Sequence, residues 1–243
     1  MSPNYQPPVS RLLELGELPA RKNPWPNYLD LDLSEEHIDE LIRMALDPAL
    51  NDAMSDSDEV WAALHAWRAL GQLRAEKAAG PLTQLLVRID ENDDDWVMDE
   101  LPIVFGMIGP PAIAVLQEYL ANPGNPIWAQ VAATEGLKKI AQQHPHTRDE
   151  CVRILIQQLS HFAEQDETLN SFIILQLMDL KAVKALDVIK QAFEADRVDP
   201  YVHGDLENVL NEMGIPVSRP QPIYKPPKQP RKKKQPRKKS KKR

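Results

Sequence analysis

Cysteine is almost absent from this sequence, since Cys151 is the single cysteine among 243 residues. One thiol excludes an internal disulfide and a cysteine-rich zinc site. Apolar runs long enough to span a bilayer are missing as well. The stretch from Met1 to Pro8 is polar and proline-rich and has no apolar core of a signal peptide. We therefore expect a cytoplasmic protein, in a reducing environment, with no transmembrane segment.

Acidic residues are missing from the C-terminal stretch Arg219 to Arg243, which holds 13 of the 29 Lys and Arg residues. The rest of the chain then has 16 basic residues against all 36 acidic ones. The formal net charge of −7 is thus an average over an acidic body and a basic tail. A tail of this composition buries little apolar surface and repels itself, so we expect residues 215–243 to be disordered.

Period-two alternation, the pattern of a half-buried strand, is also absent, whereas apolar residues recur at helical spacing. In the clearest pair, the first helix has an apolar stripe that ends before Gly71: Val60, Leu64, Trp67 and Leu70. The second stripe begins after a break at Gly80 and Pro81: Leu82, Leu85, Leu86 and Ile89. Later pairs have the same layout, with Trp128 among the apolar positions and with Pro102 expected to kink its helix.

The turns that separate the two helices of each pair recur every 32 to 40 residues, at Gly71, Gly109, Ala141, Lys181 and Gly214. Such a period is typical of a helical repeat, in which stacking hides apolar faces that one hairpin cannot bury alone. We predict an all-α fold, a right-handed α-solenoid of HEAT-like hairpins over residues 31–214, followed by the disordered basic tail. Residues 1–30 are predicted to be a proline-rich extended lead-in, with Trp25, Tyr28 and Leu29 packed against the first helices.

Three segments carry a resemblance to a known family: Glu59 to Leu86 (EVWAALHAWRALGQLRAEKAAGPLTQLL), Glu100 to Leu120 (ELPIVFGMIGPPAIAVLQEYL) and Ala132 to Pro145 (AATEGLKKIAQQHP). They resemble bacterial HEAT-like repeat proteins of the phycobilisome-lyase repeat class, over roughly residues 31–214. The resemblance implies the fold and says little about activity. Some relatives carry a C-terminal SEC-C zinc motif, from which this chain departs because it has no cysteine there.

Candidate catalytic and metal-binding residues have plainer explanations. The acidic run Asp90, Glu91, Asp93, Asp94 and Asp95, with Asp99 and Glu100, offers oxygen ligands for a cation, but it lacks the spacing of an EF-hand. We interpret it as a solvated loop that places negative charge at the start of the helix near Trp96. The six histidines include no HExxH-like pair, and Cys151 has no companion His and acid, so we expect a structural thiol. Neither catalytic residues, nor a metal, nor a cofactor is predicted.

His65 lies between Trp61 and Trp67 on one helix, where the three could form a ligand-binding cluster. Aromatic residues at three- to four-residue spacing are more often core residues, and we favour that interpretation.

The second helices of successive hairpins line one face of a solenoid, which makes this face a candidate groove for a protein or peptide. The polar residues expected there are Gln84, Arg88, Gln117, Arg153, Gln157, Lys184 and Lys190. A plain solvated face is an equally good interpretation.

The basic tail is the second candidate binding segment. Its charges would bind a polyanion by counterion release, and with Tyr224 as its single aromatic residue it lacks a stacking platform for bases. Nucleic acid, an acidic protein, the acidic body of the same chain, and anionic lipid all remain candidate partners, and a tail that serves only solubility is a further alternative. The residues concerned are Lys225, Lys228, Arg231, Lys232, Lys233, Lys234, Arg237, Lys238, Lys239, Lys241, Lys242 and Arg243.

We therefore expect a non-enzymatic scaffold that binds a protein partner and whose tail contacts a polyanion. One alternative, implied by the resemblance alone, is a chaperone-like factor related to chromophore lyases and acting on phycobiliproteins. Another is a helical-repeat protein that binds nucleic acid through its body, which the acidity of the body disfavours.

Overall fold

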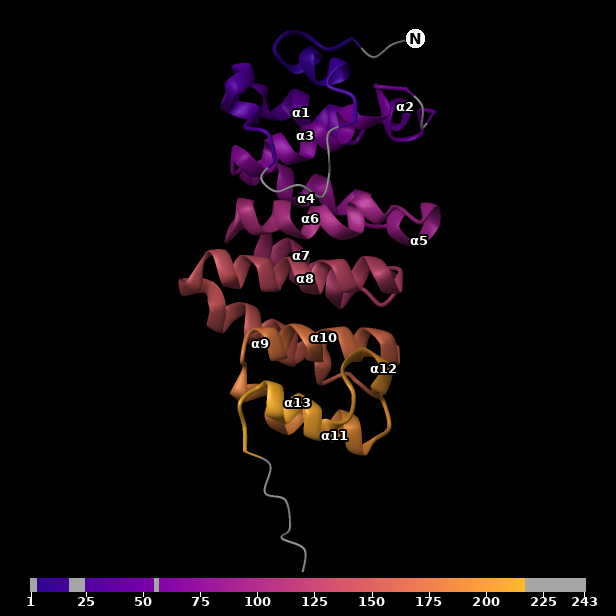
Figure 1. The fold of residues 1–243 in the computed structure, drawn as a ribbon, viewed down its shortest axis with the longest axis vertical. Coiled ribbons are helices and arrows are strands. Elements are labelled where there is room, and N and C mark those ends of the chain that lie inside the picture. The colour runs from indigo at the N-terminus through magenta and orange to yellow at the C-terminus, as the bar shows by residue number, and fades with distance from the viewer. Residues whose placement is uncertain (1–3, 18–24, 55–56, 217–243) are drawn as a thin grey trace, which may run out of the picture.

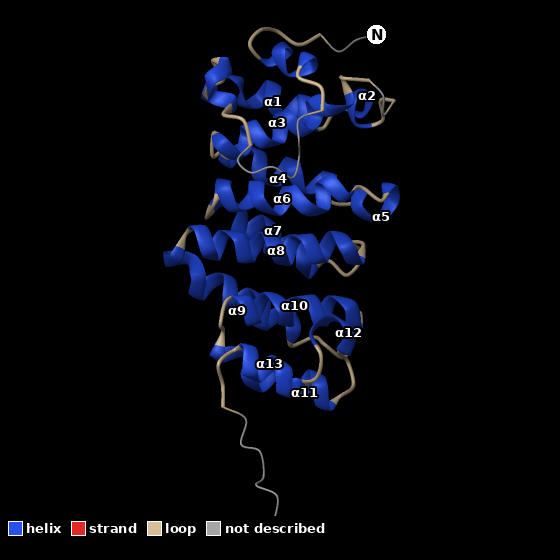
Figure 2. Cartoon of the chain, viewed as in Figure 1, coloured by secondary structure: helices blue, strands red, loops and turns tan. Residues whose placement is uncertain are grey.

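The computed structural model of the chain describes residues 4–17, 25–54 and 57–216. Within these ranges every regular element is a helix and there is no strand (Figure 2). The prediction of an all-helical protein is confirmed. None of the helices in this part of the chain has both the length and the apolar composition needed to cross a membrane.

The helices follow one another along the chain with short connections. The α-helices are α1 (Ile38–Ala45), α2 (Pro48–Asn51), α3 (Val60–Gln72), α4 (Ala79–Leu82), α5 (Arg88–Asn92), α6 (Asp95–Ile108), α7 (Pro111–Ala121), α8 (Ile127–Gln143), α9 (Arg148–Leu159), α10 (Glu167–Asp179), α11 (Leu186–Glu194), α12 (Pro200–His203) and α13 (Leu206–Glu212). The 3₁₀ helices are η1 (Val9–Glu14), η2 (Tyr28–Leu31), η3 (Glu35–His37), η4 (Glu76–Ala78), η5 (Thr83–Leu85), η6 (Pro145–Thr147) and η7 (Val183–Ala185).

Helix pairs lie side by side along the long axis of the molecule (Figure 1). In one row α3 contacts α6, α6 contacts α8, and α8 contacts α10; in the other, α4 contacts α7, α7 contacts α9, and α9 contacts α11. The helices of the first row end at Gln72, Ile108, Gln143 and Asp179, so successive pairs are 36, 35 and 36 residues apart. Each pair thus covers the apolar face of the next pair.

Three of the predicted helix boundaries were wrong. Ala141, predicted as a turn, lies inside α8, which continues to Gln143. Gly71 lies inside α3, which continues to Gln72, and the chain reverses at Arg74, a residue with φ of 52°. Gly80 and Pro81 do not break a helix either, because both lie within α4. Proline is compatible with the first turn of a helix, where its missing amide hydrogen has no partner to lose.

Helix α6 approaches α8 closely at Gly106. A Cβ atom built on Gly106 would lie 2.8 Å from Cβ of Lys139 and 2.7 Å from Nε2 of Gln143. Only glycine fits this crossing without displacing a neighbour. Pro102 lies inside the same helix and is buried, and α6 continues through it; the kink remains a prediction.

The lead-in differs from the extended segment that was predicted. It contains η1 and η2, and both contact α3. Val9, Leu12 and Tyr28 are fully buried. Trp25 packs against the core as predicted, whereas Leu29 is exposed. The residues of this segment in the ranges 1–3 and 18–24 lie outside the described residues.

Trp128 also departs from its predicted place in the core. Its side chain is 43% exposed at the start of α8 and meets the ring of Phe172 edge-on, with 5.5 Å between ring centroids. The other apolar residues predicted for this face of the helix, from Val131 to Ile140, are buried, so only the first position of the stripe departs from the prediction.

Candidate functional site

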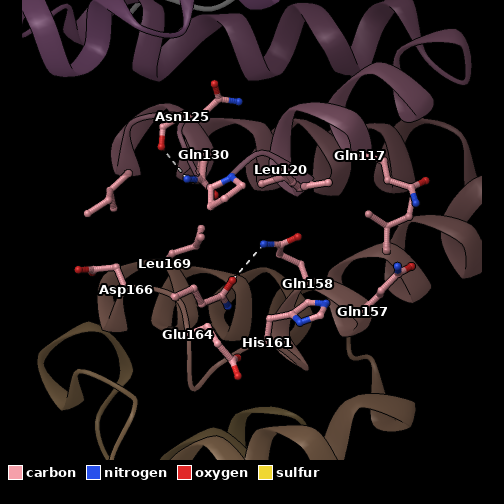
Figure 3. A pocket seen from close by; sticks show the side chains of 15 residues that line it. Gln117, Leu120, Asn125, Gln130, Gln157, Gln158, His161, Glu164, Asp166 and Leu169 are labelled. Carbon is pink, nitrogen blue, oxygen red and sulfur yellow. Dashed lines mark hydrogen bonds between the residues drawn. The ribbon is translucent and has the colours of Figure 1, made fainter.

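A groove of about 510 Å³ lies between the second-row helices α7 and α9 and the beginnings of α8 and α10 (Figure 3). Its floor is apolar, because Leu120, Ile154 and Leu169 reach it as nearly fully buried side chains. The complete lining is Gln117, Leu120, Ala121, Pro123, Asn125, Ile127, Gln130, Ile154, Gln157, Gln158, His161, Glu164, Gln165, Asp166 and Leu169. We call this feature the carboxamide groove, after its six Gln and Asn side chains.

The carboxamides stand on both walls of the groove. Gln117 belongs to α7 and Gln157 to α9, and Figure 3 shows them on opposite walls at the same end. The side chain of Gln117 has no hydrogen-bond partner among the described residues, and its amide is thus available to a ligand. A carboxamide has one C=O acceptor and an NH₂ donor, the same functions as a peptide unit.

Other carboxamides are already held in place by the fold. Nε2 of Gln158 donates to Oε1 of Gln165 at 3.0 Å, and Nε2 of Gln130 donates to the backbone oxygen of Asn125 at 2.7 Å. These contacts fix the amide planes before any ligand arrives, so less side-chain freedom is lost on binding.

The charge of the groove is of one sign. Glu164 and Asp166 line one end, and the lining contains no Lys or Arg. Asp166 also accepts a hydrogen bond from the backbone amide of Thr168 at 2.8 Å, which starts α10. The groove is thus suited to a neutral or positively charged segment and disfavours an anion.

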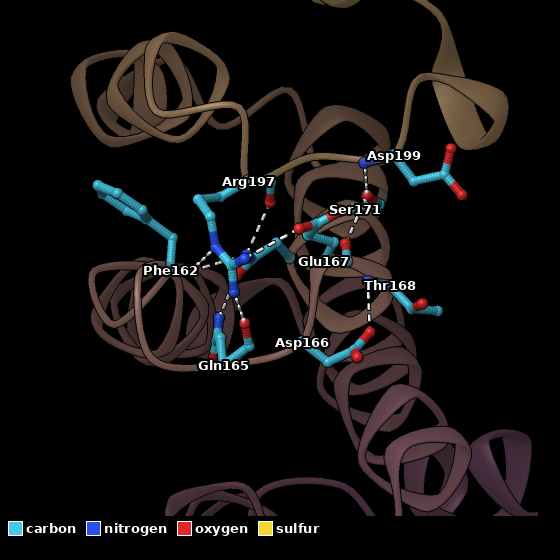
Figure 4. Close-up of polar contacts among 9 residues, drawn as sticks. Phe162, Gln165, Asp166, Glu167, Thr168, Ser171, Arg197 and Asp199 are labelled. Carbon is cyan, nitrogen blue, oxygen red and sulfur yellow. Dashed lines mark hydrogen bonds and ion pairs between the residues drawn. The ribbon is translucent and has the colours of Figure 1, made fainter.

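Arg197 connects the segment of the groove that carries Glu164, Gln165 and Asp166 to the next helix pair (Figure 4). Its guanidinium donates to the backbone oxygens of Phe162 and Gln165 at 3.3 and 2.7 Å and pairs with Glu167 at 2.9 Å. Asn170 adds hydrogen bonds to the oxygens of Phe162 and Arg197. The loop that carries Glu164 to Asp166 is therefore held on both sides.

The structure brings two of the seven predicted groove residues together in the carboxamide groove, Gln117 and Gln157. Arg153 lies beside them on α9, where it donates to Gln157 at 3.5 Å. Their common location follows from the contact between α7 and α9 in the second row.

The other four predicted groove residues do not line it. Arg88, on α5, forms ion pairs with Asp52 and Asp94, and Lys184 pairs with Asp149 at 3.2 Å. Gln84 on η5 and Lys190 on α11 are exposed. The predicted tail residues, from Lys225 to Arg243, lie outside the described residues.

Asn125, Gln130, Gln158 and Gln165 also line the groove and were missed by the sequence analysis. Asn125 and Gln165 lie outside the helices and Gln130 on the first-row helix α8, whereas the prediction covered only second helices. Gln158 does lie on the second helix α9 but was not among the predicted residues. The cluster of glutamines at 157, 158 and 165 was the available signal.

The acidic run does not behave as one solvated loop. Asp90, on α5, accepts hydrogen bonds from the backbone amides of Trp128 and Ala129 at 3.2 and 2.9 Å and so satisfies the start of α8. Asp94 caps α6 by accepting from the amide of Val97, as the sequence indicated. The interpretation was wrong for Glu100, which is buried. No cluster of His, Cys, Asp or Glu in the described ranges could hold a metal ion.

Glu100 belongs to a buried polar network that connects the lead-in to α3 and α6. Arg68 donates to both of its carboxylate oxygens, at 2.7 and 2.5 Å, and the Arg68 side chain is only 1% exposed. Arg68 also donates to the hydroxyl of Tyr28 at 3.4 Å, and that hydroxyl lies 2.8 Å from Nδ1 of His65. Nε2 of His65 lies 2.9 Å from the backbone oxygen of Gly16.

The tautomer of His65 follows from its partners. A carbonyl only accepts, so Nε2 carries the proton toward Gly16, and Nδ1 accepts from Tyr28. Burial lowers the pKa of His65 to about 4 and keeps the ring neutral near pH 7. Burial alone would lower the pKa of Arg68, but its hydrogen bonds to Glu100 and Tyr28 raise it instead. His65 and Trp67 are thus core residues, in agreement with the favoured interpretation.

Cys151 is fully buried in α9. Burial raises the pKa of its thiol to about 11, which keeps the sulfur protonated near neutral pH. This agrees with the expectation of a structural thiol.

Comparison with known proteins gives one result. A family model described as "Protein of unknown function (DUF1186)" matches residues 33–220, which is more than half of the chain. No curated protein and no solved structure matches the chain.

Proposed function

We propose that this chain, which belongs to the family described as "Protein of unknown function (DUF1186)", is a non-enzymatic scaffold that holds an extended polypeptide in its carboxamide groove. The observation that carries the proposal is the combination of an apolar floor with six Gln and Asn side chains on facing walls. The groove would take apolar side chains on its floor while the amides pair with the backbone of the bound segment.

The arrangement of the helices supports the further proposal that the body is a right-handed α-solenoid of HEAT-like hairpins. Pairs recur every 35 or 36 residues, and helices contact their neighbours along two rows. In such repeats the second helices form a continuous binding surface, and the groove lies on two of them, α7 and α9.

The chemistry of a carboxamide explains why an extended segment is the better ligand. A strand or polyproline-type segment has backbone N–H and C=O groups without internal partners, and each can pair with one Gln or Asn side chain. A helix has already satisfied these groups internally. The net gain is about 1 kcal/mol for each hydrogen bond.

The basic tail adds a second contact, to a polyanion, through charge alone. The carboxamide groove itself is unsuited to nucleic acid because Glu164 and Asp166 line it without any Lys or Arg. We place this scaffold in the cytoplasm, and its single, buried cysteine suits a reducing environment.

A peptide selection tests the proposal. Peptides selected from a random display library against the full chain would be synthesised, and their affinities measured by calorimetry. Replacing Gln117 and Gln157 together by Ala removes two amides from the groove and should weaken binding about 10- to 30-fold. The matched control replaces Gln84 and Gln191, two exposed glutamines outside the groove, and should leave affinity unchanged.

Circular dichroism and thermal unfolding would establish that both double variants fold equally well. Selected peptides that bind both variants with the affinity of the unchanged chain would show that the groove is not the binding site. A selection that yields only helical peptides would contradict the backbone-pairing argument.

A further inference from the structure

We propose that the carboxamide groove has a built-in occupant, the basic segment 217–243 of the same chain. This inference rests on the proposed function, because it assigns a particular polypeptide to the groove already described. It is carried by the charge of the groove, by the position from which the segment leaves the body, and by the segment's composition.

Charge complementarity favours this segment over other polypeptides. The groove presents Glu164 and Asp166, and the surface beyond Asp166 continues with Glu167, Asp196 and Asp199. Arg197 is the one Lys or Arg among the described residues that line the groove and this adjoining surface, and it is already paired with Glu167 and with backbone oxygens (Figure 4). Residues 217–243 carry 13 Lys and Arg residues and no acid. Opposite charges at this density attract strongly at low salt.

The described part of the chain ends in the half of the molecule that contains the groove. After α13 it reaches Ile215, whose amide donates to the oxygen of Leu210, and Figure 1 shows α13 at the same end of the molecule as α11. Helix α11 in turn contacts α9, which forms one wall of the groove. Packed helices are about 10 Å apart, whereas 27 extended residues span about 80 Å. The segment is therefore long enough to lie along the whole groove.

The composition of the segment suits the walls of the groove. It has six prolines, which favour an extended backbone and reduce the entropy lost on binding. Proline residues keep their C=O acceptor but have no N–H, and the NH₂ group of Gln117 is a donor without a partner in the described part of the chain. Because the segment is tethered, its effective concentration at the groove is in the millimolar range. A polyanion that takes up the tail would expose the groove to other polypeptides.

The test uses full-length proteins and a synthetic peptide of residues 217–243 with a fluorescent label. One protein is the unchanged chain. In the second, the neutralised chain, the twelve Lys and Arg residues from Lys225 to Arg243 are replaced by Gln. Fluorescence anisotropy at low salt should give at least a 10-fold tighter dissociation constant for the neutralised chain, because its groove is not already occupied.

Two further variants of the neutralised chain locate the binding site. Glu164→Gln with Asp166→Asn removes two charges, and Asn keeps the cap on Thr168; binding should weaken about 5- to 10-fold. Glu35→Gln with Glu36→Gln removes two acidic charges at the other end of the molecule, beyond α1, and should change the affinity less than 2-fold.

Equal affinity of the unchanged and neutralised chains for the peptide would overturn the inference. Equal losses from the two charge variants would overturn it as well, since the tail would then sense only the net charge of the body. A sedimentation mass that rises with protein concentration and depends on the tail would show exchange between copies and reject the intramolecular contact. If replacing Gln117 and Gln157 by Ala still weakens the binding of selected peptides in these cases, the proposed function stands and only the inference fails.

Discussion

Removing the carboxylate of Glu100 should cost the protein a large part of its stability. Glu100→Leu leaves the guanidinium of Arg68 buried, with the hydroxyl of Tyr28 at 3.4 Å and the face of Trp25 at 5.1 Å as its remaining partners. Neither partner carries a negative charge. Breaking a buried ion pair on one side costs about 3 to 5 kcal/mol. A domain of this size unfolds with about 5 to 15 kcal/mol, so the loss is easily measured.

A double variant separates the stranded charge from the loss of packing. Arg68→Met with Glu100→Leu replaces both partners by apolar side chains, and most of the lost free energy of unfolding should return. The exposed pair Lys77 and Asp39, with side chains 71% and 78% exposed, is the control. Lys77→Gln should change the free energy of unfolding by about 0.5 kcal/mol or less.

Urea unfolding at pH 7, followed by tryptophan fluorescence and by circular dichroism, measures these differences. The slope of unfolding free energy against urea should stay constant, since the variants leave the buried area nearly unchanged. A cost for Glu100→Leu as small as that for Lys77→Gln would refute the reasoning, because it would mean that water reaches Arg68. A double variant no more stable than Glu100→Leu would show that packing, not charge, dominates.

Three further predictions concern stability. Burial lowers the pKa of His65 in the folded chain from 6.5 to about 4, so the unfolded chain binds a proton first as the pH falls. The free energy of unfolding, measured by urea titration, should therefore fall by about 3 kcal/mol from pH 6.5 to pH 4. The variant His65→Gln should reduce this pH dependence. Gly106→Ala should lower the unfolding free energy by about 1 to 3 kcal/mol, because the added Cβ would lie 2.8 Å from Cβ of Lys139. Gly80→Ala is the control: a Cβ at this position has no neighbour within 4 Å, so the melting temperature should not fall. Asp90→Ala should cost about 1 to 2 kcal/mol in thermal unfolding by leaving two amides at the start of α8 without an acceptor. Asp90→Asn keeps one acceptor oxygen and should retain about half of that stability, because each amide donates to a different oxygen of Asp90.

The helical pairs could be predicted from the sequence because their signal is local. Apolar spacing and turn residues such as Gly109 depend on a few neighbouring positions, and the structure has Gly109 at φ of 83° directly after α6. Boundaries were less predictable where no glycine marks them: Arg74 adopts a positive φ without being glycine, and no rule of composition singles it out. Lys181, with φ of 50°, does lie at a turn that the spacing of the repeat indicated.

The polar residues could not be placed with the same accuracy. Glu100 looks like part of an acidic run, and only its partner Arg68, 32 residues earlier, reveals that it is buried. The groove combines Gln117 with Gln165 across a distance in sequence that no period connects. Long-range pairing of polar atoms depends on how the helices pack, and the pattern along one helix does not contain that information.

The first long helix of the row, α3, is covered by the lead-in. There η1 and η2 lie against α3, and the hydroxyl of Tyr28 is bound by His65 and Arg68 of α3 through buried hydrogen bonds. The lead-in is therefore a part of the folded body and takes the place that a preceding helix pair would have. A truncation before Leu31 would expose the buried Arg68 to water as well as remove apolar contacts.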